Sequence, residues 1–169
     1  VRNTAVEMLK SDLDSCSIVL GYQSDKVAEV IKDLNINLIL NPLWEEGQAS
    51  SLKAALNTLD DTYSDLLIML GDLPGVKSRH INRVIEEHLL TNNRKSKITI
   101  PSFNGENGNP VIWGKSFFPD LSNLEGDVGG RVLFSQHPAA INLLDMDDPA
   151  VVTDTDTPED FENFLNNII

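Results

Sequence analysis

The first half of the chain alternates short apolar runs with segments whose apolar residues recur at helical spacing. The runs at residues 17–20, 37–40 and 65–70 predict β-strands, and the last is continuous enough to predict a strand buried on both faces. Between and after these runs, apolar residues recur at i, i+3, i+4 and i+7, which is typical of helices that pack on one face. The predicted stripes are Val27, Val30, Ile31 and Leu34; Leu52, Ala55, Leu56 and Leu59; and Ile81, Val84, Ile85 and Leu89, with Ser24 and Ser78 as expected N-caps.

The second half has a looser pattern. It predicts strands at residues 98–100, 111–113 and 141–144, with a Gly- and Asn-rich loop at 102–109 and a short helix after Gly126-Asp127. Thr157 and Pro158 favour the start of a final helix, whose buried stripe is Phe161, Phe164, Leu165 and Ile168. Because no linker or repeat interrupts the pattern, it predicts one α/β domain over residues 1–169, with a mostly parallel sheet and right-handed crossovers.

Charge narrows the possible partners. The 169 residues include 26 Asp and Glu against 13 Lys and Arg, which gives a formal net charge of −13. Such a surface repels phosphate backbones and anionic lipid, so we expect neither nucleic-acid nor membrane binding, and a phosphorylated ligand would need a divalent cation. Cys16 is the only cysteine, which excludes an internal disulfide, and no apolar run is long enough to span a bilayer. A cytoplasmic location is therefore expected.

The clearest candidate for chemistry follows the predicted strand at 65–70. In parallel α/β sheets, ligands bind beyond the carboxyl ends of the strands. Asp72 would lie at that edge as a ligand for a hard cation such as Mg²⁺, and Gly71 beside it would let a ligand approach the backbone. The alternative is an ordinary turn, since Gly, Asp and Pro are common where strands end.

A second candidate is the acidic segment 154–160. On an extended chain Asp154 and Asp156 lie on the same face, where their repulsion is relieved by a cation or a proton. A helix N-terminus, which favours acidic residues, is the alternative explanation for most of these charges.

The third candidate is the segment 41–52, which runs from a strand through a loop into a helix. Gly47 and Ser51 offer a backbone N–H and a hydroxyl to a ligand there, although a simple N-cap with Trp44 over the edge of the core explains the same residues. His80, His88 and His137 lack metal-ligand spacing, and we expect His80 and His88 on an exposed helix face.

In chain order, the motifs form a distinctive succession. Asn41-x-x-Trp44-x-x-Gly47-x-x-x-Ser51-Leu52 precedes Gly71-Asp72-x-Pro74, and then come Pro101, the loop 105–110, Gly126-Asp127-x-Gly129-Gly130-Arg131 and Asp154-x-Asp156-Thr157-Pro158-Glu159-Asp160. Over nearly the whole chain this succession resembles the molybdenum-cofactor nucleotidyltransferases, especially the cytidylyltransferase branch and its relatives linked to xanthine dehydrogenase maturation.

The resemblance implies a three-layer Rossmann-like nucleotidyltransferase fold. It also implies transfer of a nucleoside monophosphate, CMP in preference to GMP, from CTP or GTP to molybdopterin with release of pyrophosphate. A molybdenum hydroxylase or its chaperone is the implied protein partner.

Site residues carry over position by position. Asp72 and Asp156 look like the catalytic aspartates that hold Mg²⁺, with Asp154 as further metal support. Gly47 and Ser51 match the stretch that lines the nucleotide base. The motifs on the acceptor side of the cleft are matched by Asn109, Pro110, Gly126, Asp127 and Arg131.

Two departures from the family pattern qualify these expectations. The N-terminal strand and Gly-rich loop that wrap the triphosphate have no counterpart here, and residues 1–10 resemble the helix that follows that loop. We therefore expect an N-terminally truncated domain that binds triphosphate weakly. Asn107 and Asn109 stand where the family often has a basic residue and a His, which leaves the acceptor open. A sugar or alditol phosphate is the alternative acceptor, and a non-catalytic maturation partner is the alternative role.

Overall fold

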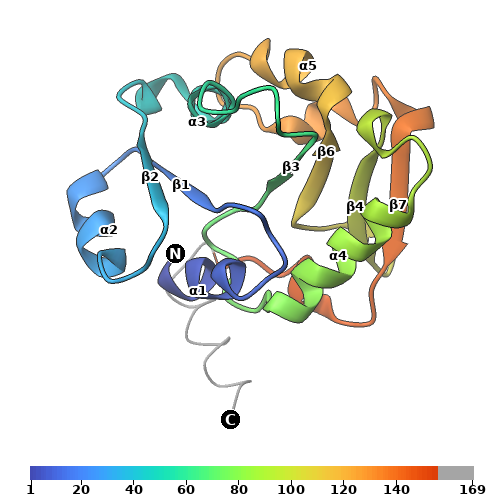
Figure 1. The fold of residues 1–169 in the computed structure, drawn as a ribbon, viewed down its shortest axis with the longest axis horizontal. Coiled ribbons are helices and arrows are strands. Elements are labelled where there is room, and N and C mark those ends of the chain that lie inside the picture. Colours follow the sequence, from blue (N-terminus) through green and yellow to red (C-terminus); the bar gives the residue numbers. More distant parts are fainter. Residues whose placement is uncertain (156–169) are drawn as a thin grey trace.

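The computed structural model describes residues 1–155 of the chain, and Figure 1 shows their α/β arrangement. The helices are α1 (Arg2–Leu9), α2 (Ser24–Ile31), α3 (Gln48–Leu56), α4 (Ser78–Leu90) and α5 (Phe118–Ser122). The strands are β1 (Ser17–Leu20), β2 (Asn37–Leu40), β3 (Asp65–Ile68), β4 (Ile98–Phe103), β5 (Glu106–Asn107), β6 (Val111–Gly114) and β7 (Ile141–Asp145). The predicted C-terminal helix lies outside the described residues. Among the described helices, none is both long and apolar enough to cross a membrane.

The strands form two sheets. Strands β1 and β2 pair in parallel, while the larger sheet has the order β3-β6-β4-β5, with β7 paired to β4 in parallel. The predicted α/β class is confirmed, but the larger sheet is more antiparallel than expected, because β6 runs against both β3 and β4. Only a short connection separates β4 from β6, and a short connection returns the chain antiparallel to the strand it has just left.

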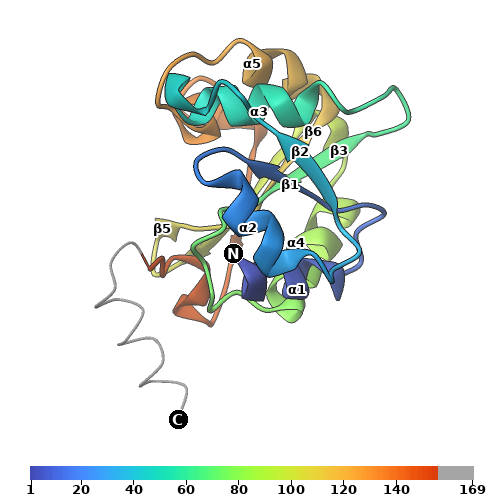
Figure 2. The same ribbon diagram turned by 90° about the vertical axis from the view of Figure 1, so that its left-hand side faces the viewer.

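Helices cover both faces of the larger sheet and so form three layers (Figure 2). On one face, α3 and α5 pack over a core that contains Val111, Trp113 and Leu121. On the other face, α4 packs over a second core that contains Ile112 and Val84. Because side chains alternate along a strand, the consecutive residues of β6 supply both cores.

The element bounds predicted from the sequence match the structure for some elements and differ for others. Strands β1 and β2 have the predicted bounds, whereas β3 ends at Ile68 and its four residues are half-buried rather than buried on both faces. The predicted caps are each displaced by one residue: Gln23 and Lys77 are the N-caps, and Ser24 and Ser78 begin the helices. The segment after Gly126-Asp127 forms a short 3₁₀ helix, Gly130–Leu133, and α5 was not predicted.

Candidate functional site

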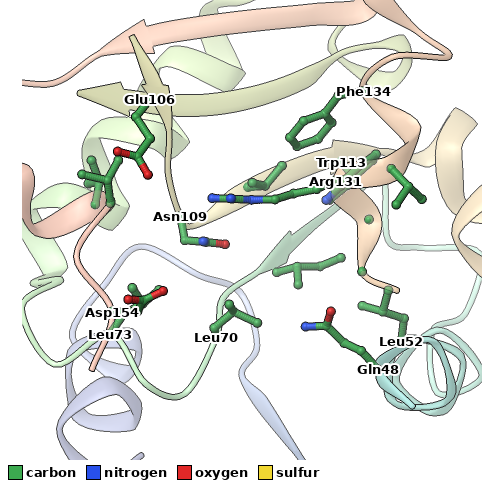
Figure 3. Close-up of a pocket in the computed structure, with 17 residues that line it drawn as sticks. Gln48, Leu52, Leu70, Leu73, Glu106, Asn109, Trp113, Arg131, Phe134 and Asp154 are labelled. Carbon is green, nitrogen blue, oxygen red and sulfur yellow. The ribbon is translucent and has the colours of Figure 1, made fainter. Parts of the chain in front are cut away.

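A cavity of about 250 Å³ opens where the start of α3, the loop before β6, the 3₁₀ helix Gly130–Leu133 and residues 151–154 meet. Its polar lining includes Gln48, Asn109, Arg131 and Asp154 (Figure 3). Within the described residues, Arg131 is the one cation of this lining, and its side chain reaches across the cavity toward Asn109. The guanidinium of Arg131 is held by the backbone, because its Nη2 donates to the backbone oxygen of Asn107 at 2.6 Å.

Asp72 lies beside this cavity rather than in its wall, between the lining residues Leu70 and Leu73. Its backbone oxygen accepts two hydrogen bonds from Thr155, one from the amide at 3.1 Å and one from the hydroxyl at 3.0 Å. Among the described residues, the buried oxygen Oδ1 of Asp72 has no hydrogen-bond partner. A buried carboxylate oxygen without a partner is costly, so this atom is available to a ligand that can offset the loss of water.

The second acidic candidate is only partly described. Asp154 is exposed and lines the cavity, and the hydrogen bonds of its neighbour Thr155 bring this segment against Asp72. Asp156 lies outside the described residues, so its expected role stays a prediction. Segments far apart in sequence are thus joined at one side of the cavity, and the expected roles of Asp72 and Asp154 as metal ligands stay predictions.

Gly47 and the motif at 126–127 form a second junction. The amide of Gln48 donates to Oδ1 of Asp127 at 3.2 Å, and that of Ala49 donates to the backbone oxygen of Gly126 at 3.2 Å. Gly47 has φ 97° and ψ −177°, and a Cβ there would lie 2.5 Å from the amide nitrogen of Asp127. Only glycine therefore permits this contact, which joins the two predicted motifs at the start of α3.

Ser51 contributes to the shape of this loop. The buried Asn41 donates from Nδ2 to the hydroxyls of Ser50 at 2.8 Å and Ser51 at 3.1 Å, and its Oδ1 accepts from the amide of Leu43 at 3.0 Å. Neither Ser51 nor Gly126 is part of the cavity lining, and the same holds for Pro110 and Gly71. Gly71 instead lies near the N-terminus, where its backbone oxygen accepts from Thr4 Oγ1 at 3.2 Å.

Sequence reasoning missed the aromatic part of the lining. Trp113 and Phe134 stack with ring centroids 5.6 Å apart and an interplanar angle of 24°. Both line the cavity, as does the carboxylate residue Glu106. Phe134 belongs to no motif, and Trp113 was interpreted only as part of a strand, so periodicity carried no signal that they would share a ligand-sized space.

The expectation that His80 and His88 are exposed is wrong, since they are 4% and 1% exposed. His88 contacts Oδ1 of Asp65 at 3.0 Å and the hydroxyl of Thr99 at 2.8 Å. His80 contacts Oδ2 of Asp148 at 3.0 Å. These partners come from other strands and loops, and a buried imidazole is stable where such groups satisfy its nitrogens.

The carboxylates near the cavity fit a magnesium ion. Within residues 1–155, no three His, Cys, Asp or Glu side chains gather as a metal site. A Mg²⁺ ion that carries a nucleotide needs only one or two carboxylates, because phosphate oxygens and water supply its other ligands. Asp72, with its unpartnered Oδ1, and the exposed Asp154 are oxygen donors of that kind.

Comparison with curated proteins finds three relatives of low identity. The bifunctional protein GlmU of Prochlorococcus marinus is 25% identical over 104 residues, 62% of this chain and 22% of GlmU. The purine catabolism protein PucB of Bacillus subtilis is 27% identical over 120 residues, 70% of this chain and 56% of PucB. The molybdenum cofactor cytidylyltransferase of Escherichia coli is 23% identical over 163 residues, 90% of this chain and 77% of that enzyme. The chain thus spans about a fifth of GlmU and about half of PucB.

Solved structures share the fold. The Rv0371c homologue of Mycobacterium sp. strain JC1 superposes with a TM-score of 0.82 and 25% identity, over 99% of this chain and 81% of that chain. A manganese complex of Rv0371c from Mycobacterium tuberculosis superposes with a TM-score of 0.74 and 18% identity, over 97% of this chain and 84% of that chain.

The sequence model of one family covers most of the chain. It is described as the MobA-like NTP transferase domain, and it matches residues 2–141, which include Gly47, Asp72, Asn109 and Arg131. The chain belongs to the MobA-like NTP transferase domain family.

Proposed function

We propose that this protein transfers a nucleoside monophosphate, CMP in preference to GMP, from the triphosphate to molybdopterin and releases pyrophosphate. Family membership supports nucleotidyl transfer as the reaction class. The relation to the Escherichia coli molybdenum cofactor cytidylyltransferase, which extends over 90% of this chain, supports the choice of base and acceptor. The observation that carries the proposal is the unpartnered Oδ1 of Asp72 beside a cavity lined by Arg131 and Asp154.

The residues of the cavity match the needs of this reaction. An oxygen of the acceptor's terminal phosphate attacks the α-phosphorus, the bond to the β-phosphate breaks, and pyrophosphate leaves, so no protein nucleophile is required. Arg131 faces the cavity with its guanidinium fixed by Asn107, which suits it to hold a phosphate oxygen. Asn109 opposite offers an amide to orient the same group.

Asp72 and Asp154 are the proposed holders of Mg²⁺, with Asp156 as the second catalytic aspartate. When bound, the ion would supply positive charge against the phosphates. The chain needs this charge, because its own net charge of −13 opposes a triphosphate. The junction of Gly47, Gln48 and Asp127 brings two of the motifs together at the start of α3, which supports their placement around one substrate site.

A carboxamide in place of Asp72 tests the proposal. Asp72→Asn keeps the size of the side chain but removes the charge that would hold the cation, so we expect pyrophosphate release from CTP with molybdopterin to fall about 100-fold or more. Asp14→Asn is the matched control, because Asp14 is exposed and lies in the loop before β1, and it should leave the rate unchanged.

The acceptor is tested in the same assay with sugar and alditol phosphates. Turnover with these acceptors but not with molybdopterin would replace the proposed acceptor and keep the reaction class. Full activity of Asp72→Asn would refute the metal-dependent mechanism. If the protein shows no turnover but binds a molybdenum hydroxylase, the non-catalytic role replaces the enzymatic one.

A further inference from the structure

Residues 146–155, here called the return segment, connect β7 to the cavity. Three of its contacts involve residues of the candidate site or their neighbours. The amide of Asn109 donates to the backbone oxygen of Val151 at 2.8 Å, and Thr155 donates twice to the backbone oxygen of Asp72. Asp154, between these two anchors, lines the cavity. The conformation of the return segment therefore determines the position of Asp154 relative to Asp72.

Near its start, the return segment carries a carboxylate that is held by several partners. Oδ1 of Asp148 accepts from the amide of Ala150 at 2.9 Å and so caps the 3₁₀ helix Pro149–Val151. Oδ2 contacts Nε2 of His80 at 3.0 Å and Nη2 of Arg79 at 2.8 Å. The hydrogen bond from the amide of Ala150 is the largest influence on the pKa of this carboxyl and lowers it. Burial raises the pKa, whereas Arg79 and His80 lower it, and the net result is a pKa below its ordinary value.

His80 is well defined by its surroundings. Its Nδ1 accepts a hydrogen bond from the backbone N–H of Lys77 at 3.1 Å, which places the proton of the neutral ring on Nε2, facing Asp148. The ring is buried, and burial lowers its pKa below the ordinary value. One imidazole therefore performs two tasks: it caps α4 through Nδ1, and it donates to the return segment through Nε2.

We propose that His80 is a positioning residue which, through Asp148, fixes the return segment so that Asp154 and Thr155 lie against Asp72. Loss of the Nε2 contact frees the Asp148 carboxylate to rotate, which weakens the cap on Ala150 and then the anchors at Asn109 and Asp72. Arg79 does not replace His80, because its side chain is largely exposed and an exposed ion pair constrains little. The consequence for catalysis rests on the proposed function, whereas the effect on the return segment does not.

Two substitutions at one position separate the two tasks of the ring. Asn at position 80 places an acceptor near the location of Nδ1 but is too short to reach Asp148. Gln places an amide donor near the location of Nε2. Arg79→Ala is the matched control, since it removes the exposed partner of the same carboxylate.

The first readout is amide hydrogen exchange of Asn109 and Thr155, followed by NMR. We expect about tenfold faster exchange in His80→Asn, and rates near wild type in His80→Gln and Arg79→Ala, with the amides inside α4 unchanged in all three. The second readout is Mn²⁺ affinity, which should weaken about tenfold in His80→Asn alone. Asp148→Asn should reproduce the effect of His80→Asn, which provides a second test if position 80 proves intolerant of change.

The two readouts distinguish the possible failures. Unchanged exchange at Asn109 and Thr155 in both His80→Asn and Asp148→Asn overturns the positioning role and leaves the proposed function standing. Faster exchange together with no Mn²⁺ binding in the wild-type protein keeps the positioning role and overturns the metal site. Equal loss in His80→Asn and His80→Gln, with global destabilisation in both, shows that His80 is merely structural and also overturns the proposal.

Discussion

At the scale of single residues, Gly47 shows most directly how a backbone conformation shapes the candidate site. Its φ of 97° with ψ near 180° belongs to a region that residues with a Cβ almost never occupy. The backbone of Asp127 then lies so close that a methyl group has no room. The glycine thus allows the start of α3 to meet the motif at 126–127.

Gly47→Ala tests this contact. Backbone strain and the overlap with Asp127 together should lower the free energy of unfolding by about 3 kcal/mol and weaken CTP binding. Gly105→Ala is the control, because Gly105 also has a positive φ of 83° but a Cβ there would meet nothing within 4 Å. It should cost about 1 kcal/mol. Equal urea midpoints for the two variants would contradict the role assigned to the close approach.

Two histidines show the limit of prediction at this scale. Periodicity placed Leu89 in the buried stripe of α4 and His88 outside it, yet Leu89 is 56% exposed and His88 is buried. The imidazole of His88 is buried against the sheet, where Asp65 and Thr99 provide its polar partners. Those partners are 23 and 11 residues away in sequence, so a pattern local to the helix carries no information about them.

At the scale of elements, a polar network joins α4 to the edge of the sheet. Asp65, the first residue of β3, accepts from Nε of Arg94 at 3.1 Å and from the hydroxyl of Ser64 at 2.7 Å, and it contacts the buried His88. Burial raises the pKa of Asp65, but the hydrogen bonds from His88, Ser64 and Arg94 outweigh this and lower it below the ordinary value. The network therefore holds the ionised carboxylate beside the last turn of α4, where His88 lies.

Asp65→Ala should lower the free energy of unfolding by about 3 kcal/mol, because it leaves Nε2 of the buried His88 without a partner. The matched control is Asp61→Ala, which removes the exposed carboxylate that pairs with Lys115 at 3.2 Å and should change stability by less than about 0.5 kcal/mol. Urea unfolding of both variants measures the difference. A cost for Asp65→Ala as small as that of the control would show that the network does not hold α4.

The elements themselves were largely predictable, but their directions were not. A run such as residues 17–20 is apolar over the length of a strand and is followed by Gly21, so its bounds follow from local sequence. The antiparallel direction of β6 depends on how β4 and β6 pair across the Gly- and Asn-rich loop, and both strands have the same local pattern whichever way they run. Direction is a property of the pair, not of either strand.

At the scale of the whole molecule, folding shifts the pKa values of several ionisable groups and so favours either their charged or their neutral form. A side-chain hydrogen bond from Arg2 lowers the pKa of Asp33 to about 2, and the amide of Ser78 lowers the pKa of Glu7. For His80 the main cause is burial, which lowers the pKa against the opposing charges of Asp148 and Asp147, while the positive charge of Arg79 acts in the same direction as burial. The folded state therefore binds fewer protons than the unfolded chain in two separate pH ranges.

Stability should consequently fall in two stages on acidification. As the pH drops below about 6.5, the unfolded chain protonates at position 80 while the buried ring stays neutral, so the free energy of unfolding begins to fall. A second, larger fall follows below about pH 4, where the unfolded carboxyl groups protonate before Asp33, Asp148 and Glu7 of the folded state.

Urea unfolding between pH 4.5 and 8 measures the first stage. His80→Asn should remove the part of the decline between pH 7 and 5.5 that belongs to this imidazole. The same slope in wild type and variant would show that His80 does not titrate differently in the two states.

By itself, the sequence determined the α/β class, the bounds of β1 and β2 and the family resemblance. It also singled out Asp154, Asn109 and Arg131, which line the cavity, and their roles there stay predictions. These depend on local period and on motif spacing, which a linear chain carries in full. Only the tertiary structure decided that Trp113 and Phe134 share the cavity with Arg131, that His80 reaches Asp148, and that Thr155 contacts Asp72. The contacts of Trp113 with Phe134, of His80 with Asp148 and of Thr155 with Asp72 join residues that are 21 or more positions apart in the sequence. Packing of both sheet faces selects such partners, and no pattern within one segment specifies them.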